Sequence, residues 1–198
     1  GWPLVAASRI TKYPIRQRVT GSDFIIPLCR LLAADGLSVF LLGSSTEVLK
    51  LSSKRLLEIV PGLVIGGTYS PPYGFEKDPR QLDIIDQEIS RARPHALFVA
   101  LGAPKQEIWM QARVQHLPIG VAIGIGATLD FLAGKQRRAP YILQTLGLEW
   151  LWRALSDPHR LGRRYLLDIA LLPRLVFGQV VRHLITKRNT VRERVLPG

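Results

Sequence analysis

Apolar runs alternate with segments of helical period along residues 1–134. The runs are rich in Val, Ile, Leu and Phe and almost continuous in apolarity, which is typical of strands covered on both faces. We expect such strands at residues 38–42, 63–67, 95–101 and 119–124. Strands that alternate with helices predict an α/β fold, Rossmann-like, with a mostly parallel sheet flanked by helices.

The segments between these runs carry the helical pattern. Leu82, Ile85 and Ile89 form an apolar stripe, and Ser44 followed by Glu47 predicts a capping box. The Pro- and Gly-rich stretch 69–79 predicts a loop after a strand, where doubly wound sheets place ligands. Helices are expected at residues 22–34, 46–60, 80–92 and 106–115.

Composition suggests one domain with an appendage. The chain has 198 residues and is 47% hydrophobic, which is sufficient for a buried core. Its single cysteine, Cys29, excludes an intramolecular disulfide and fits a reducing compartment. The net charge is +12, and residues 135–198 hold 13 of the 27 basic residues but only 4 of the 15 acidic ones. We therefore expect an α/β domain at residues 1–134 and a basic appendage at 135–198 that meets phosphate, anionic lipid or nucleic acid.

Within the appendage, residues 165–185 are mostly apolar but interrupted by Asp168, Pro173, Arg174, Arg182 and His183. An ionised residue at the centre of a bilayer costs about 2.5 to 3.5 kcal/mol. A basic amphipathic element on an anionic membrane surface is therefore favoured over a span. The alternative is a helix that packs on its own domain or on another subunit of a homo-oligomer. Residues 1–9 show no secretory signal, so we expect a cytoplasmic protein peripheral to the inner face of the membrane.

The stretch "LGAPKQE" forms a turn between an expected strand and an expected helix. Such a turn presents free backbone N–H groups and the positive end of a helix dipole, which together favour an anion. Gly102 allows close approach of a ligand, Lys105 suits a phosphate, and Gln106 suits the edge of a base. The alternative is an ordinary turn with solvated polar residues.

The stretch "GIGATLDFLAG" follows the next strand and should lie beside the first turn at the same sheet edge. Gly124 and Gly126 match the start of a dinucleotide fingerprint, but its third glycine is missing, so an NAD-binding oxidoreductase is a weak alternative. Asp130 suits a ligand hydroxyl or imide, or else the dipole of its own helix.

Three further groups of residues bear on chemistry. In "RVTGSDF", Arg18 suits a phosphate, whereas Ser22 as N-cap and Asp23 suit helix stability. Asp83 and Asp86 share a helix face, but no D-x-D motif follows a strand, and the histidines are scattered at positions 95, 116, 159 and 183. We therefore expect no catalytic metal and no cofactor. Nucleic acid is not an expected partner either, because no DNA-binding motif is readable.

These stretches together resemble the WecG/TagA/CpsF glycosyltransferases of bacterial cell-surface polysaccharide synthesis. The matching pieces occur in the family's order over residues 1–167: "RVTGSDF", "VFLLGS", "VALGAPKQEIWM", "GIGATLDFLAG", "RRAP" and "LGLEWLWRALSDPHRLGRRYL". The resemblance implies transfer of a sugar from a UDP-sugar to a polyprenyl-diphosphate-linked saccharide, with inversion, at the cytoplasmic membrane face. The identity of the sugar stays open.

The resemblance also implies roles for individual residues. Gln106 and Asp130 would contact the nucleotide, and Arg18 would serve the active site. The cations that meet the diphosphate would come from the appendage, with Arg160 stabilising the departing UDP. They are Arg153, Arg160 and Arg163 or Arg164.

The chain departs from the family's pattern at its start. Relatives carry a preceding segment whose aspartate is the expected general base, and Gly1 matches a position just after it. Loss of a general base lowers rates by about 10²- to 10⁴-fold, so we expect this chain alone to be weak or inactive. A non-catalytic, membrane-associated assembly component is the main alternative.

Overall fold

The computed structural model describes residues 8, 20–136, 139–140, 142–143 and 152. The chain divides into two compact units, one of Val19–Arg137 and one of Gly1–Arg18 with Arg138–Gly198. The architecture below is that of the first unit taken by itself. The expected boundary between residues 134 and 135 stays an expectation.

A four-stranded parallel sheet forms the centre of this unit. The strand order is β2-β1-β3-β4. The chain runs outward from β1 to β2 and then crosses to the other side of β1 for β3 and β4. The order in which strands are added to the sheet therefore reverses, and the switch point lies between β1 and β3. This is a doubly wound α/β sheet, as predicted. The strands are β1 Ser38–Gly43, β2 Val64–Tyr69, β3 Ala96–Ala100 and β4 Val121–Gly124.

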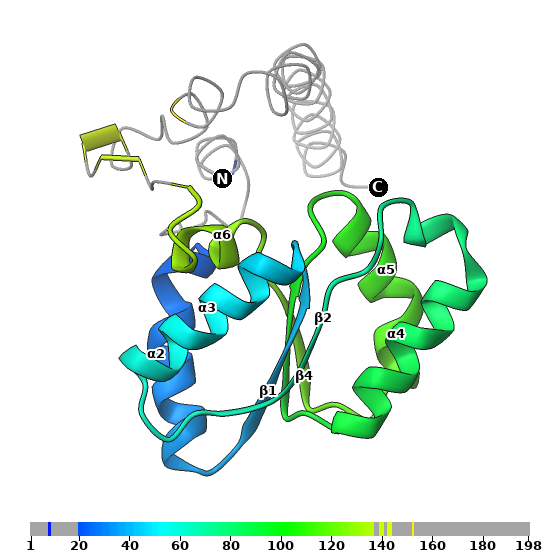
Figure 1. Cartoon of the computed structure of the whole chain (residues 1–198), viewed down its shortest axis with the longest axis horizontal. Coiled ribbons are helices and arrows are strands. Elements are labelled where there is room, and N and C mark those ends of the chain that lie inside the picture. The colour runs from blue at the N-terminus through cyan, green and yellow to red at the C-terminus, as the bar shows by residue number, and fades with distance from the viewer. Residues whose placement is uncertain (1–7, 9–19, 137–138, 141, 144–151, 153–198) are drawn as a thin grey trace, which may run out of the picture. The chain divides into compact units, whose positions relative to one another are not determined.

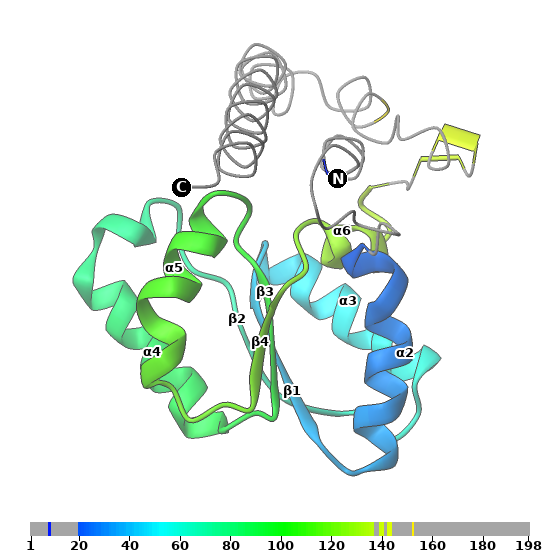
Figure 2. The same cartoon turned by 180° about the vertical axis from the view of Figure 1, so that it is seen from behind.

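Helices cover both faces of the sheet (Figures 1 and 2). One face carries α2 Gly21–Ala34, α3 Thr46–Ile59 and α6 Thr128–Leu132. The other carries α4 Pro79–Ala92 and α5 Lys105–Arg113. Short 3₁₀ turns precede α4 and follow α5, at Phe75–Lys77 and Val114–His116. The last expected helix is thus shorter than 106–115, and the expected loop 69–79 contains a helical turn.

Alternation along the central strands separates two apolar cores. In β1, Val39 and Leu41 pack with α2 and α3, whereas Phe40 and Leu42 pack with α4 and α5. All residues of β3 are buried, while β2 and β4 keep exposed positions such as Val64 and Val121. The expectation that every strand is covered on both faces is therefore wrong for β2 and β4, which lie at the edges of the sheet, where the helices cover the faces less completely than over β1 and β3.

Two helix starts differ in detail from the expectation. The carboxylate of Asp23 accepts hydrogen bonds from the backbone N–H and hydroxyl of Thr20, at 3.2 and 2.6 Å, so Thr20 and not Ser22 is the N-cap of α2. At α3 the cap is Ser45, whose hydroxyl accepts from the Val48 N–H at 3.3 Å, and not Ser44. The expected apolar stripe of α4 is confirmed, since Ile85 and Ile89 are fully buried.

In the part of the chain that the structure describes, no helix combines the length and the apolar composition that crossing a bilayer requires. The basic amphipathic element expected at residues 165–185 lies outside the described residues.

The central strands approach most closely where β1 ends. Gly43 pairs with Ala100 and has a φ of 104°. A Cβ added at Gly43 would lie 2.6 Å from the carbonyl carbon and oxygen of Ala100. Only glycine combines this left-handed backbone with so close a strand crossing.

We expect Gly43→Ala to lower the free energy of unfolding by about 2 to 4 kcal/mol, through backbone strain and a clash between strands. Gly62→Ala is the matched control. Gly62 also has a positive φ, 86°, but an added Cβ there meets no described atom within 4 Å. It should cost about 1 kcal/mol. Urea unfolding of both variants measures the difference, and equal losses would contradict the close approach.

Candidate functional site

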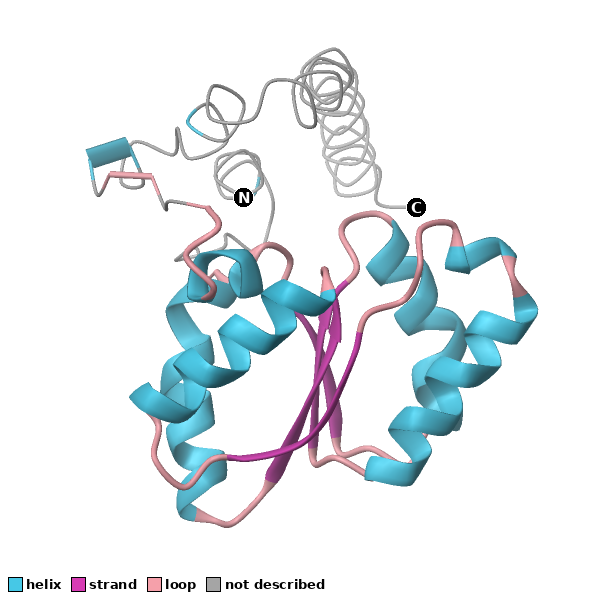
Figure 3. Cartoon of the chain, in the orientation of Figure 1, coloured by secondary structure: helices cyan, strands magenta, loops and turns pink. Residues whose placement is uncertain are grey.

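Turns that follow three neighbouring strands meet at the carboxyl edge of the sheet, the upper edge in Figure 3. They follow β1, β3 and β4, and both β1–β3 and β3–β4 are paired in parallel. The predicted juxtaposition of the "LGAPKQE" and "GIGATLDFLAG" turns is therefore confirmed. In doubly wound sheets this edge, at the reversal of strand order, is where ligands bind.

Ser44 connects the turns at this edge. Its backbone is left-handed, with a φ of 60°, and its N–H donates to the carbonyl of Ala100 at 3.1 Å. Its carbonyl accepts a hydrogen bond from the Ser70 hydroxyl at 2.7 Å. Its own hydroxyl donates to the Asp130 carboxylate at 3.4 Å. Ser44 thus links the ends of β1 and β3 to the loop after β2 and to α6.

Asp130 lies in the first turn of α6, as expected of a helix-start acid. The hydroxyl of Thr128 ties this short helix to the end of β4 by donating to the Ile125 carbonyl at 2.5 Å. The Ser22 hydroxyl lies 3.3 Å from the Thr128 hydroxyl and connects α2 to the same turn. These contacts fix the backbone of α6 and therefore the position of Asp130. Its carboxylate faces Ser44 from the α2–α3 side of the sheet.

Gln106 lies against the end of β4. Its side chain is buried, and its amide nitrogen donates to the Glu107 carboxylate at 2.9 Å. Its amide oxygen has no hydrogen-bond partner among the described residues. A Cβ added at Gly124 would lie 2.7 Å from the Gln106 amide nitrogen. The structure thus brings together Gln106 and Gly124, which the sequence predicted separately. Gln106 occupies the space that a side chain at position 124 would need, and this explains why the residue there is glycine.

Gly102 and Gly126 leave the edge open. Both have positive φ, 78° and 56°, and a Cβ added at either meets no atom within 4 Å among the described residues. The turn at Gly102 continues through a cis peptide bond between Ala103 and Pro104. Side-chain-free backbone in open space permits close approach of a ligand.

Lys105 has a protein partner in this structure. Its ammonium lies 2.6 Å from the Glu76 carboxylate, which belongs to the loop before α4. It also lies 4.9 Å from the centre of the Tyr73 ring, a cation–π contact. The hydrogen bond from Lys105 holds the pKa of Glu76 below its usual range. The phosphate contact expected of Lys105 stays a prediction.

Asp83 and Asp86 have a structural role. Both pair with Arg113 of α5, at 3.8 and 2.9 Å, and so connect α4 to α5. Burial raises the pKa of Asp86, and the Arg113 guanidinium opposes that rise. Among the described residues, no group of three His, Cys, Asp or Glu side chains is placed to hold a metal ion.

The arginines expected at the site lie outside the described residues. They are Arg18, Arg153, Arg160, Arg163 and Arg164. Their expected roles stay predictions.

Residues that the sequence does not indicate as site residues complete the described site. The sequence predicts Ser44 as part of a capping box, and it predicts no individual role for Thr128, Ser70, Tyr73 or Glu76. The run Ser44–Ser45–Thr46 does carry a signal, because several adjacent hydroxyls after a strand exceed what one helix cap requires. No comparable signal marks Glu76, whose partner is distant in sequence.

Comparisons of the sequence with known proteins provide a separate line of evidence. A profile of the glycosyl transferase WecG/TagA/CpsF family matches residues 1–186. Similar proteins include the "N-acetylglucosaminyldiphosphoundecaprenol N-acetyl-beta-D-mannosaminyltransferase" of Staphylococcus aureus strains MW2, NCTC 8325 / PS 47 and MRSA252. Each is 30% identical over 167 residues, which cover 82% of this chain and 62% of the relative. The chain therefore spans less than two thirds of the length of these relatives.

Gly124→Ala should destabilise the fold by about 1 to 3 kcal/mol, because the new methyl group overlaps the Gln106 amide. In a chain that also carries Gln106→Ala, the obstructing amide is gone. The double variant should then lose about 1 kcal/mol less than the sum of the single variants. Urea unfolding of all three measures this coupling.

Gly66→Ala is the control, because its added Cβ would make only ordinary contacts, the nearest at 3.7 Å. Strictly additive losses for Gly124→Ala and Gln106→Ala would show that the two residues do not touch.

Proposed function

We propose a function from one premise: the chain belongs to the glycosyl transferase WecG/TagA/CpsF family. We infer that it takes part in transfer of a sugar from a UDP-sugar to a polyprenyl-diphosphate-linked saccharide. The names of the similar Staphylococcus aureus proteins support this acceptor class, since they specify a sugar carried on diphosphoundecaprenol. The UDP-sugar donor is our own proposal.

The observation that carries the proposal is the pair of neighbouring turns at the sheet edge. One offers a buried amide, Gln106, whose oxygen has no partner among the described residues. The other offers the Asp130 carboxylate, and Gly102 and Gly126 leave open space beside them. An amide suits the edge of a uracil, a carboxylate suits ribose hydroxyls or the imide N–H, and open backbone admits phosphates.

The proposed reaction is a direct displacement. An acceptor hydroxyl, after loss of its proton to a general base, attacks the anomeric carbon as the bond from that carbon to the UDP oxygen breaks. The configuration inverts, and UDP leaves with the bonding electron pair. By the resemblance, Arg160 stabilises that charge without a metal, together with Arg153 and with Arg163 or Arg164, while Arg18 serves the same centre.

Among the described residues we assign no general base. Asp23 is not a candidate, because the backbone N–H and hydroxyl of Thr20 donate to its carboxylate.

The lipid-linked acceptor also implies a place of action. A polyprenyl diphosphate stays in the bilayer with its headgroup in water, so the enzyme must work at the membrane surface. The basic residues concentrated in 135–198 suit an anionic lipid surface, and we place the protein on the inner face of the membrane.

The direct test is transfer itself. Purified residues 1–198, and a longer protein that carries the preceding segment, are each given UDP-sugars and a polyprenyl-diphosphate-linked saccharide, with and without a chelator. We expect transfer that the chelator does not affect. Binding to anionic vesicles with no transfer by either protein would favour a non-catalytic assembly component.

Asp130→Asn should weaken UDP binding by about 10- to 100-fold, because it removes a charged acceptor of hydrogen bonds while it preserves size. Asp35→Asn is the control, because Asp35 is exposed at the opposite edge of the sheet, between α2 and β1. Calorimetric titration with UDP measures both. Equal affinities for the two variants would remove Asp130 from the nucleotide site.

Arg160→Ala in the longer protein should lower the rate of transfer more than it weakens binding of the UDP-sugar, since the leaving charge develops only during reaction. Rates under single-turnover conditions, compared with the dissociation constant, separate the two effects. A change in binding alone would refute the leaving-group role.

A further inference from the structure

The ammonium of Lys105 is engaged by one loop of the protein. Glu76 supplies the carboxylate at 2.6 Å, and Tyr73 supplies the ring face at 4.9 Å. Both belong to the loop that joins β2 to α4. Lys105 itself is the first residue of α5, in the turn after β3. The contact therefore crosses the carboxyl edge of the sheet on the side of α4 and α5.

This loop is fixed at both ends. At its start the Ser70 hydroxyl donates to the Ser44 carbonyl, and at its far end Phe75 is buried in the core under α4 and α5. Gly74, with a φ of 83°, makes the turn between them. Tyr73 and Glu76 are thus presented at the edge by an anchored loop, and the Tyr73 side chain is fully exposed.

We propose that Glu76 holds the Lys105 ammonium in a resting position, from which the diphosphate of a bound nucleotide displaces it. The inference rests on the proposed function, because it takes the diphosphate to lie beside Gly102. Glu76 is then a positioning residue. It lowers the affinity of the site for any anion by the strength of one ion pair.

The physical chemistry of the pair suits such an exchange. The side chains of Lys105 and Glu76 are 36% and 33% exposed, so water screens their attraction and the pair is weak. An ammonium on a flexible four-carbon stem moves easily between acceptors, which a bidentate guanidinium does not. A diphosphate carries more charge than a carboxylate, and the N-terminus of α5 at the same turn favours an anion.

The test measures binding of UDP, uridine and inorganic pyrophosphate to the full chain by calorimetry. Glu76→Gln should bind UDP and pyrophosphate about two- to fivefold more tightly than the original chain, with the gain shrinking as salt rises. Uridine, which has no phosphate, should bind equally to both.

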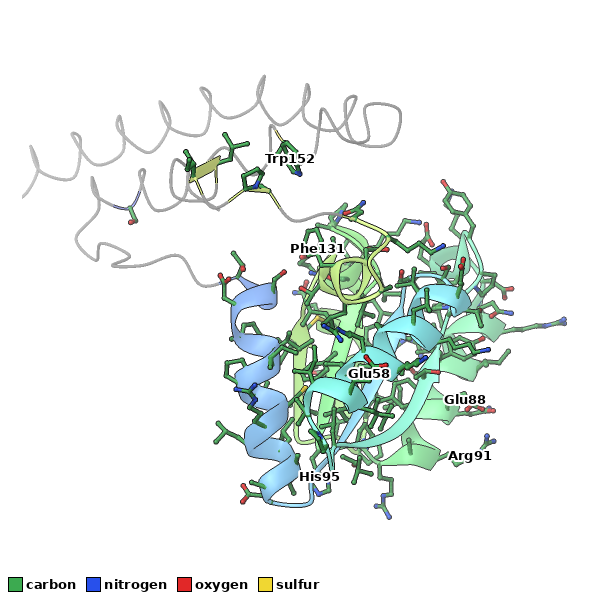
Figure 4. The ribbon with its side chains drawn as sticks, turned by 60° about the vertical axis from the view of Figure 1, so that its left-hand side comes forward. Glu58, Glu88, Arg91, His95, Phe131 and Trp152 are labelled. Carbon is green, nitrogen blue, oxygen red and sulfur yellow. The ribbon has the colours of Figure 1, made fainter. Side chains whose placement is uncertain are left out.

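Glu88→Gln is the matched control. Glu88 pairs with Arg91 at 2.8 Å on α4, toward the C-terminal end of that helix (Figure 4). Like Glu76→Gln, the Glu88→Gln substitution removes one negative charge and breaks an exposed ion pair. It should leave the affinity for UDP unchanged. The decisive comparison is made in a chain that also carries Lys105→Met. Once the ammonium is absent, adding Glu76→Gln should have no effect on UDP affinity.

Three results would overturn the inference alone, with UDP still bound: unchanged or weaker binding by Glu76→Gln, an equal gain from Glu88→Gln, or a gain that persists with Lys105→Met. The last would mean that Glu76 acts by direct repulsion. If neither UDP nor pyrophosphate binds the original chain or any variant, the inference fails together with the proposed nucleotide site.

Discussion

The whole carboxyl edge depends on the close approach of two backbones, at the point where β1 ends against β3. No side chain fits between Gly43 and Ala100, and the chain leaves this crossing in a left-handed conformation at Ser44. Ser44 then has its N–H, carbonyl and hydroxyl each directed to a different partner. A backbone constraint in the sheet therefore sets the positions of the loop after β2, the turn after β3 and the start of α6.

The polar groups at this edge fall on two sides of the sheet. Asp130 and Ser44 lie with α3 and α6, whereas Lys105 and Glu76 lie with α5 and α4. Gln106 lies between them against Gly124, with Gly102 and Gly126 open beside it. Base and ribose recognition on one side and phosphate recognition on the other would use both groups at once. This division follows from the doubly wound topology, in which the crossover from β1 to β2 lies on one face of the sheet and the crossovers from β2 to β3 and from β3 to β4 lie on the other.

Much of this arrangement was predictable from the sequence, because strand and helix periods and the order of turns are local signals. The four strands, the helices α2 to α5 and the meeting of the two glycine-containing turns were predicted, whereas the short helix α6 and the 3₁₀ turns were not. Choices between equivalent neighbours were not: Ser44 and Ser45 are chemically identical, and only the left-handed backbone at Ser44 makes Ser45 the cap. The pairing of Lys105 with Glu76 joins two separate crossovers, and no local pattern encodes such a contact.

The parallel pairing of the two innermost strands has a consequence for biosynthesis. Val39 of β1 pairs with Ala96 of β3, and all of α3, β2 and α4 lies between them in the chain. During translation β1 therefore leaves the ribosome long before the strand that closes its second edge. Until residue 100 has emerged, the run from Val39 to Leu42 is an apolar strand with one unpaired edge. Such a segment is a substrate for chaperones and a starting point for aggregation.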